Sequence, residues 1–390
     1  MKHAIVIIGA NNFQNPLILK AKELGYETHV FAWKDGAVGA ETADHFYPIS
    51  IINKEEILEI CRKISPKGIL SVGSDLAVPT VNYIAEKLGL VGNGAECTLM
   101  STNKFEMRRR LRKYGLPMPS FTLTGSKDGI DTKGFHYPLI VKPVDRSGSR
   151  GVTKVLGPDG LARAIQCSLD SSFEKKAIVE EYIDGPEYSA ECISYQGEHR
   201  LLALTQKFTT GSPHFIETGH LQPVALDEQT VSKIVTTIQK GLDALGIKFG
   251  ASHSEFRIKP DGSIAIIEIG SRMGGDCIGS DLVRLSTGYD FIKMAIDVAC
   301  GNSPDFTKYN QPKIAFIRFI FDENDLYQLN RIKKVCPSAI YRISPIELPG
   351  LQKVTDSSTR LGYYILTCSS KKQLNELLQL HEVSCDERKE

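Results

Sequence analysis

The first hundred residues alternate short apolar runs with amphipathic segments, and this alternation strongly limits the fold. Residues 4–8 form an apolar run that ends at Gly9, residues 15–26 have helical spacing, and residues 28–33 again predict a strand. The pattern repeats over residues 54–90 as helix, strand and helix. Strands separated by helices predict a parallel sheet with crossover helices. Ligands of such sheets gather at the carboxyl ends of the strands, here near residues 9–12 and 73–75.

A dinucleotide-binding sheet of this kind needs G-x-G-x-x-G after its first strand and an acidic residue after its second. This chain has GANNFQ after the first strand and FAWKDG after the second. Asp35 alone is a weak signal, more typical of a turn residue. We therefore rank a nicotinamide-dependent dehydrogenase low.

Composition narrows the partners and the compartment. The 390 residues allow two or three domains, and 47 Lys and Arg against 46 Asp and Glu leave a net charge of +1, which favours a small-molecule partner over nucleic acid or a membrane surface. The nine scattered cysteines include no C-x-x-C pair, which is typical of reduced thiols in a cytosolic protein. No apolar run suits a signal peptide or a membrane span, so we expect a cytoplasmic protein.

The rest of the chain predicts mixed helix and sheet. A helix follows Ser101 or Thr102 as N-cap, and its basic run over residues 108–113 is expected to be a solvated face. Residues 120–190 predict a compact α+β unit, and residues 206–223 a long polar loop. An amphipathic helix over 227–246, two strands about a Pro-Asp-Gly-Ser turn over 250–275 and a terminal α+β piece from about residue 305 complete the pattern.

Two segments carry the chemistry. Residues 141–152, VKPVDRSGSRGV, place Lys142 at the root of a glycine-bearing loop, and the two later strands place Glu255 and Glu268 opposite each other. Paired carboxylates near an apolar sheet require a cation, and oxygen ligands without His or Cys suit Mg²⁺. The combination predicts nucleoside triphosphate chemistry. It is not a P-loop, because G-x-x-x-x-G-K-[ST] is absent.

The order of these motifs resembles the ATP-grasp carboxylate-amine ligases over residues 104–275. The resemblance implies an α/β and α+β chain: an ATP-grasp fold with an N-terminal Rossmann-like pre-grasp domain and a small C-terminal α+β domain. The implied bounds are 1–100 for the pre-grasp domain, 101–304 for the ATP-grasp domain with a lid over about 120–190, and 305–390 for the C-terminal domain.

The resemblance also assigns an ATP site. Lys104 and Lys142 match the lysines that contact the phosphates, and the loop that covers them contains Ser147, Gly148, Ser149 and Gly151. The segment IVEEYIDGPEYS matches the nucleoside contacts. Within it Glu180 faces the adenine amino group, Glu187 faces the ribose, and the adjoining contacts come from Glu181, Tyr182 and Ile183.

Metal and catalytic roles follow from the same resemblance. Glu255 and Glu268 match ligands of Mg²⁺, or of Mn²⁺ in its place, and Arg272 matches an arginine that holds the substrate carboxylate or the acyl phosphate formed from it. Lys142 is the second residue with an expected catalytic role. Gly270 stands where an asparagine is usual in the family, and Asn103 stands where an aspartate is frequent before the first lysine.

The implied function is a magnesium-dependent, ATP-binding ligase that forms C–N bonds between a small-molecule carboxylate and an amine, with amino acids as the favoured substrates. His214, Glu217 and His220 in the polar loop are candidates to orient the amine or accept its proton. Many family members are dimers, so a homodimer is the assembly to test. Two alternatives stay open: a ligase similar to glycinamide ribonucleotide synthetase or carbamoyl phosphate synthetase, and an ATP-binding regulator without turnover.

Overall fold

The N-terminal part is the parallel sheet that the sequence predicts. The structure is a computed structural model that describes residues 2–347 and 354–379; within the expected C-terminal domain, residues 348–353 and 380–390, with Cys385 among them, lie outside these ranges. The strand order is β3 (His45–Tyr47), β2 (Glu27–Phe31), β1 (Ala4–Ile8) and β4 (Gly68–Leu70). The first helices are α1 (Asn15–Glu23), α2 (Lys54–Ile64) and α3 (Val78–Leu88). Ile5, Ile7 and Ile8 are fully buried, because both faces of a parallel sheet are covered.

Two consecutive helices join this sheet to the rest of the molecule. They are α4 (Ala95–Thr102) and α5 (Lys104–Lys113). The sequence expectation of Ser101 or Thr102 as N-cap is wrong, because both residues lie in the last turn of α4. The cap of α5 is Asn103, whose side chain accepts hydrogen bonds from the backbone N–H groups of Phe105 and Glu106. This cap fixes Lys104 at the first position of α5.

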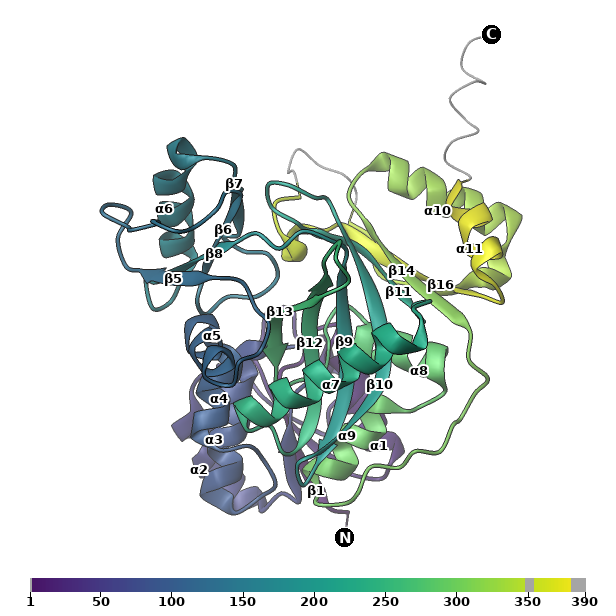
Figure 1. Cartoon of the computed structure of the whole chain (residues 1–390). Helices are drawn as coiled ribbons and strands as arrows, with labels where there is room; N and C mark the ends of the chain where they lie inside the picture. The colour runs from purple at the N-terminus through teal and green to yellow at the C-terminus, as the bar shows by residue number, and fades with distance from the viewer. Residues whose placement is uncertain (1, 348–353, 380–390) are drawn as a thin grey trace.

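A small antiparallel sheet forms a separate layer, at the upper left of Figure 1. Its strand order is β5 (Phe121–Thr124), β8 (Ala177–Glu181), β6 (Leu139–Pro143) and β7 (Thr153–Val155), and α6 (Leu161–Ser171) packs on it. The two parts share a buried cluster that includes Leu139, Val141 and Ile165. We call residues 121–181 the lid, since they lie within the range expected for it.

The central sheet has eight antiparallel strands. Across the sheet they are β13 (Ile264–Gly270), β12 (Gly250–Ile258), β9 (Glu187–Tyr195), β10 (Glu198–Thr209), β11 (Glu217–Gln222), β14 (Ile314–Ile320), β16 (Gly362–Cys368) and β15 (Ile340–Ile343). The sheet therefore runs without a break across the boundary expected at residues 304 and 305. The expected long loop over 206–223 is mostly the β10–β11 hairpin, and only residues 210–216 connect its strands.

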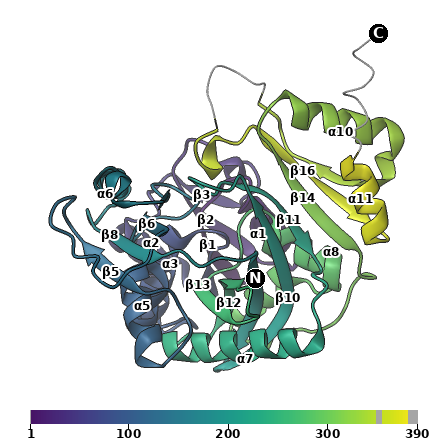
Figure 2. The ribbon, with the colours of Figure 1, turned by 45° about the horizontal axis from the view of Figure 1, so that its top comes forward.

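Helices cover the central sheet on both faces. The first, α7 (Glu228–Leu245), crosses one face near α5, while α8 (Val283–Thr287) and α9 (Phe291–Ala299) pack on the other (Figure 2). The last two, α10 (Glu323–Val335) and α11 (Lys371–Gln379), lie against β14 and β16. Among the described residues, no helix combines the length and apolarity that a membrane span needs. The eight described cysteines are free thiols, as the sequence predicts.

Candidate active site

A cleft between the lid and the central sheet gathers most of the residues that the sequence singles out. It holds about 980 Å³ of space, including its open mouth. Most of the expected site residues line it: Lys104, Lys142, Ser147, Gly148, Ser149, Glu180, Glu181, Tyr182, Ile183, Glu187, Glu217, Glu255, Glu268 and Arg272. They come from α5, the lid strands, the glycine loop and four strands of the central sheet. Segments up to 168 residues apart thus meet in one place.

Lys104 stands at the floor of the cleft. Its Nζ donates to the carbonyl oxygen of Arg146 in the glycine loop at 2.7 Å and to Glu268 Oε1 at 2.9 Å. Burial opposes the charge on Lys104, but the carboxylate of Glu268 outweighs burial and raises the pKa of the amine. Lys104 is therefore a fixed positive charge that links the glycine loop to the central sheet.

Lys142 lies in a buried chain of charges on the lid side. Its Nζ is 2.8 Å from Glu180 Oε2, and Glu180 Oε1 accepts from Arg108 Nε at 2.6 Å. Burial disfavours ionised Glu180, but Arg108 and Lys142 together hold the pKa of its carboxyl below the ordinary value. Both carboxylate oxygens of Glu180 are thus committed to cations, so its side chain does not stand free for an adenine amino group.

The sequence analysis predicted the wrong environment for Arg108. The basic run was expected to form a solvated helix face, yet Arg108 is 0% exposed. Its Nη2 also donates to the carbonyl oxygen of Ile267 at 2.6 Å. Met107 and Leu111 on the same face of α5 are buried as well, and this helical spacing was the available signal. Arg108 ties α5, the lid and β13 together.

The hinge between the lid and β9 offers a backbone donor. The N–H of Tyr182 donates to the carbonyl oxygen of Pro138 at 2.9 Å, whereas within the described chain the N–H of Ile183 has no acceptor. The carbonyl oxygen of Ile183 accepts from Arg257 Nη1 at 3.1 Å. A backbone donor that faces a cleft beside a neighbouring acceptor suits the edge of an adenine ring.

Arg257 organises the side of the cleft next to the hinge, and the sequence analysis missed it. Its Nη2 and Nε donate to Glu187 Oε2 at 2.8 and 3.2 Å, and its Nη1 donates to the hydroxyl of Tyr182 at 2.8 Å. Phe215, from the loop between β10 and β11, stacks on Tyr182 with ring centroids 6.0 Å apart. The strand alternation of EFRI points Arg257 to the same face as Glu255, and that signal was present in the sequence.

Glu255 and Glu268 lie directly opposite each other on β12 and β13. Glu255 Oε1 accepts from Lys207, and His253 Nε2 lies 3.2 Å from the same oxygen. Burial acts against the charge of Glu255, but Lys207 and His253 hold the pKa of its carboxyl well below the ordinary value. In the described chain, Oε2 of Glu255 and Oε2 of Glu268 have no hydrogen-bond partner. Two neighbouring carboxylates with free oxygens beside Lys104 and Lys142 fit Mg²⁺ or Mn²⁺.

Arg272 reaches from the end of β13 to the N-terminal sheet. Its Nε and Nη2 donate to Asp75 Oδ1 and Oδ2 at 2.7 and 3.0 Å, and its Nη1 donates to the carbonyl oxygen of Met273 at 3.3 Å. Asp75 lies at the carboxyl end of β4, where the sequence predicts ligand contacts. A Cβ on Gly270 would lie 3.3 Å from both Arg272 Nε and Asp75 Oδ1. Glycine at position 270 therefore leaves room for this ion pair.

Of the three substrate candidates, the structure brings only Glu217 to the cleft. His214 is exposed and lies 3.2 Å from the carbonyl oxygen of Val152, outside the cleft. His220 is 1% exposed and packs edge-on against Phe319, because it lies on a strand and not on a loop. Gly151 also lies outside the lining, where its positive φ and missing Cβ let the glycine loop pack on Ser171.

A C-terminal segment, residues 357–360, contacts residues that line the cleft. Ser357 Oγ donates to Glu217 Oε2 at 2.5 Å, and Arg360 makes a bidentate pair with Asp276 at 2.6 and 2.9 Å. The N–H of Ser357 lies 3.5 Å from the carbonyl oxygen of Gly148 in the glycine loop. The C-terminal part thus contacts both the loop and the candidate acid of the cleft.

Comparisons with known proteins agree with this architecture. Residues 135–280 match the family model described as an ATP-grasp domain. Alanine-anticapsin ligase from Bacillus subtilis (strain 168) is 26% identical over 305 residues, which are 68% of this chain and 63% of that protein. The matched region covers 65% and 63% of the lengths of the first two curated relatives. The chain therefore spans less than two thirds of each of them.

Solved structures show the same fold over nearly the whole chain. The L-amino acid ligase from Bacillus licheniformis has a TM-score of 0.81 at 23% identity and covers 98% of this chain and 97% of its own. Phosphoribosylglycinamide synthetase from Anaerococcus prevotii has a TM-score of 0.75 at 20% identity, with 97% and 98% covered. The fold expected from the sequence is therefore confirmed, including the N-terminal and C-terminal parts that flank the matched domain.

Proposed function

Because the chain belongs to the ATP-grasp superfamily, we propose that it is an ATP-dependent carboxylate-amine ligase that joins amino acids, or a small carboxylic acid and an amino acid. ADP and phosphate are the other products. The observation that carries the proposal is the cleft, which combines Lys104 and Lys142, the glycine loop, the carboxylates of Glu255 and Glu268, and Arg272. The likeness to an L-amino acid ligase and to alanine-anticapsin ligase supports amino acids as substrates.

The first step is phosphoryl transfer to the carboxylate. A carboxylate oxygen bonds to the γ-phosphorus of ATP, the bond from that phosphorus to the bridging oxygen breaks, and ADP leaves. Lys104 and Lys142 set positive charge where the phosphoryl oxygens carry negative charge. Both lysines pair with glutamates in the free protein. When the nucleotide binds, its phosphates replace these glutamates as ion-pair partners, and the lysine side chains need to move little.

Glu255 and Glu268 would hold Mg²⁺, or Mn²⁺ in its place, through the oxygens that have no protein partner. When bound, the ion neutralises phosphate charge. Lys207 and His253 keep Glu255 ionised. The hinge N–H of Ile183 and the stacked rings of Tyr182 and Phe215 position the base, and Glu187, fixed by Arg257, faces the ribose.

The second step forms the amide. The amine nitrogen bonds to the acyl carbon, the carbon–oxygen bond to phosphate breaks, and the nitrogen loses a proton. Arg272 has one N–H left on each of Nη1 and Nη2 after its bonds to Asp75 and Met273, and these hold the acyl phosphate. Glu217 accepts the proton, because it is the carboxylate among the three loop candidates that faces the cleft. Lid closure excludes the water that would hydrolyse the acyl phosphate.

The test is mass spectrometry of the products after the full chain is incubated with ATP, Mg²⁺ and pooled amino acids. We expect a dipeptide-type product together with ADP and phosphate in equal amounts. ADP release with phosphoribosylamine and glycine, or with bicarbonate, and none with amino-acid pairs would favour the glycinamide ribonucleotide synthetase or carbamoyl phosphate synthetase alternative. ATP binding without phosphate release from any of these mixtures would favour a regulator.

A further inference from the structure

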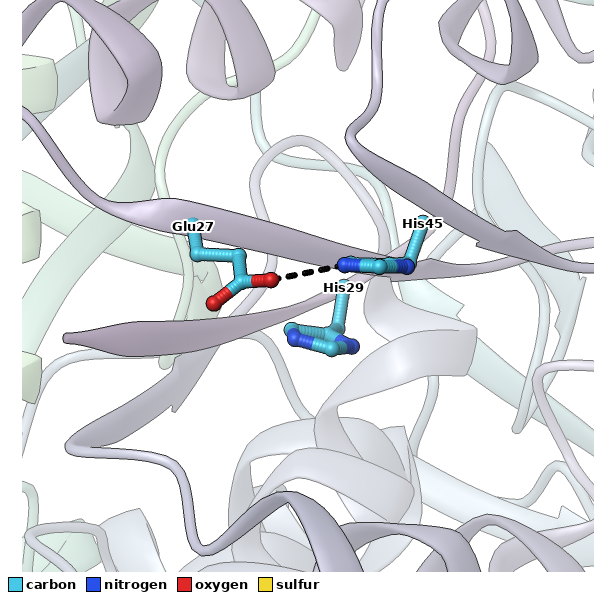
Figure 3. A group of neighbouring side chains, drawn as sticks. All are labelled: Glu27, His29 and His45. Carbon is cyan, nitrogen blue, oxygen red and sulfur yellow. Dashed lines mark hydrogen bonds and ion pairs between the residues drawn. The ribbon is translucent and has the colours of Figure 1, made fainter. Parts of the chain in front are cut away.

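A second group of ionisable side chains lies on the N-terminal sheet, away from the cleft. Glu27 and His29 are two residues apart on β2, so both project from the same face of the strand. His45 on β3 is the register partner of His29. Figure 3 shows the three side chains close together, with the contact between Glu27 and His45 marked by a dashed line. None of them lines the cleft.

Each of these residues offers a potential ligand atom, and the three atoms lie within 4.8 Å of one another. His45 Nε2 is 2.7 Å from Glu27 Oε1. His29 Nδ1 is 3.0 Å from the hydroxyl of Tyr47, and within the described chain His29 Nε2 has no partner. When Nδ1 of His29 donates to the hydroxyl oxygen of Tyr47, Nε2 keeps its lone pair and can bind a metal ion.

Glu27 lacks a fixed positive charge as its partner in the part of the chain that the structure describes. Among the described residues, no lysine or arginine forms an ion pair with Glu27, whose one ionisable partner is His45. A neutral imidazole has a free lone pair, and metal binding requires that form.

We propose that Glu27, His29 and His45 bind a divalent transition-metal ion of the Zn²⁺ class. Two imidazole nitrogens and one carboxylate oxygen are donors that Zn²⁺ takes and that Mg²⁺ disfavours. Three protein ligands leave further positions for water, which agrees with a site on an open surface. The proposed metal site uses no residue that lines the cleft. A test of metal binding is therefore independent of the proposed ligase activity.

Binding requires one rearrangement. The rings of His29 and His45 are stacked, with centroids 4.4 Å apart and planes 15° apart. Because the lone pairs of imidazole lie in the ring plane, an ion cannot bridge two stacked faces. The ring of His45 must therefore turn out of the stack, and its side chain is 46% exposed, which leaves room for the turn. The ion replaces the hydrogen bond between His45 and Glu27.

The consequence is a cross-link at the edge of the sheet. β3 is an edge strand of three residues, held to β2 by its register pairs. An ion shared by Glu27, His29 and His45 ties this short strand to its neighbour in the folded state alone, so it should raise the unfolding temperature.

The experiment is titration calorimetry of the full chain with ZnCl₂, and with MgCl₂ for comparison. We compare wild type with His45→Ala and Glu27→Gln. The matched control is His136→Ala, since His136 is 90% exposed and also pairs with a glutamate but has no second histidine beside it. We expect one Zn²⁺ site in wild type and in His136→Ala. Glu27→Gln should weaken it by more than the roughly 10-fold to 100-fold that loss of a supporting partner causes.

His45→Ala should lose the site altogether, and MgCl₂ should not fill it. Equal Zn²⁺ affinity and stoichiometry in wild type and His45→Ala would overturn the proposal, as would the absence of saturable Zn²⁺ binding to wild type. If His136→Ala lost the same site, the ion would be elsewhere and the assignment would be wrong. Circular dichroism of each variant confirms folding, and the exposure of His45 makes its replacement safe for the fold.

Discussion

The cleft between the lid and the central sheet and the group formed by Glu27, His29 and His45 both bring carboxylates and histidines together, but they balance charge in opposite ways. In the cleft, Glu268 pairs with Lys104, Glu180 with Lys142 and Glu255 with Lys207. On the N-terminal sheet, Glu27 meets the ring of His45 and no fixed positive charge among the described residues. The cleft is charge-balanced before a ligand arrives, and the N-terminal group is not.

This difference in charge balance indicates which kind of ligand each of the two sites can bind. A balanced and buried network receives a ligand that carries charges of both signs, as a nucleotide with its metal ion does, because cations and anions of the protein are already in position. A partly exposed carboxylate beside two imidazole rings suits a bare cation. Variants should therefore have large effects in the cleft and small ones on the N-terminal sheet.

The largest effect is expected from Arg108→Met, which should lower the free energy of unfolding by about 3–5 kcal/mol. Arg108 and Glu180 are 0% and 3% exposed, so the change removes a cation from a buried pair. The measurement is urea denaturation at neutral pH. The control is Arg109→Met one residue away, where the pair with Glu106 is exposed and about 0–1 kcal/mol is expected. Equal losses in the two variants would contradict a preorganised cleft.

Next in size is Glu268→Gln, which should reduce ATP-dependent product formation about 10²-fold to 10³-fold, as loss of one charge-stabilising group does. The amide keeps the shape but neither binds a divalent ion well nor pairs with Lys104. ADP release and product mass measure the effect. Glu198→Gln, an exposed position on β10, is the control and should be unchanged. If the Glu268→Gln variant kept full activity, the paired carboxylates would not take part in the reaction.

The sequence could predict the features that depend on local patterns, but not those that depend on contacts between distant segments. Apolar periodicity predicted the strands and helices of the N-terminal part, α7 and the β12–β13 hairpin, because the spacing of apolar residues within each element is a local signal. Motif order placed Lys104, the glycine loop and the glutamates in one cleft. Helical spacing with Met107 and Leu111 was a local signal for the burial of Arg108, but its pairing with Glu180 joins residues 72 apart in the sequence, which no local pattern encodes.

Polar strands were the other source of error. Residues 206–223 have the composition of a loop, yet they form a hairpin because the neighbours β9 and β14 complete the sheet on either side. As strands, the segment brings Lys207 and Glu217 to the lining of the cleft and buries His220, which is the register partner of Lys207. The continuation of the central sheet into residues 314–368 likewise depends on strand pairing between distant segments.

A smaller effect with a distinct pH dependence is expected from Asp276→Asn. Burial opposes ionisation of Asp276, but Arg360 and His220 hold the pKa of its carboxyl below the ordinary value. The stabilisation is therefore fully present above that ordinary value, near pH 4, and is lost as the pH falls from there toward the lowered folded pKa. We expect a loss of about 1.5–3 kcal/mol at pH 7.

The measurement is urea denaturation of wild type and Asp276→Asn between pH 7 and pH 3. The difference between them should be constant from pH 7 to about pH 5 and shrink below about pH 4. The exposed Asp159→Asn is the control and should show no such difference. A gap that widens as the pH falls would contradict the pairing of Asp276 with Arg360.

The smallest effect is expected from Glu27→Gln in metal-free buffer, within about 0.5 kcal/mol of wild type, because the pair with His45 is exposed. Added Zn²⁺ should separate the two proteins: at 100 times the dissociation constant, wild type should gain about 2.7 kcal/mol and Glu27→Gln much less. Thermal unfolding with and without ZnCl₂ measures both quantities. A large loss of unfolding free energy in metal-free buffer would mean that Glu27 already belongs to a charge-balanced network like that of the cleft. The two regions would then not differ in how they balance charge.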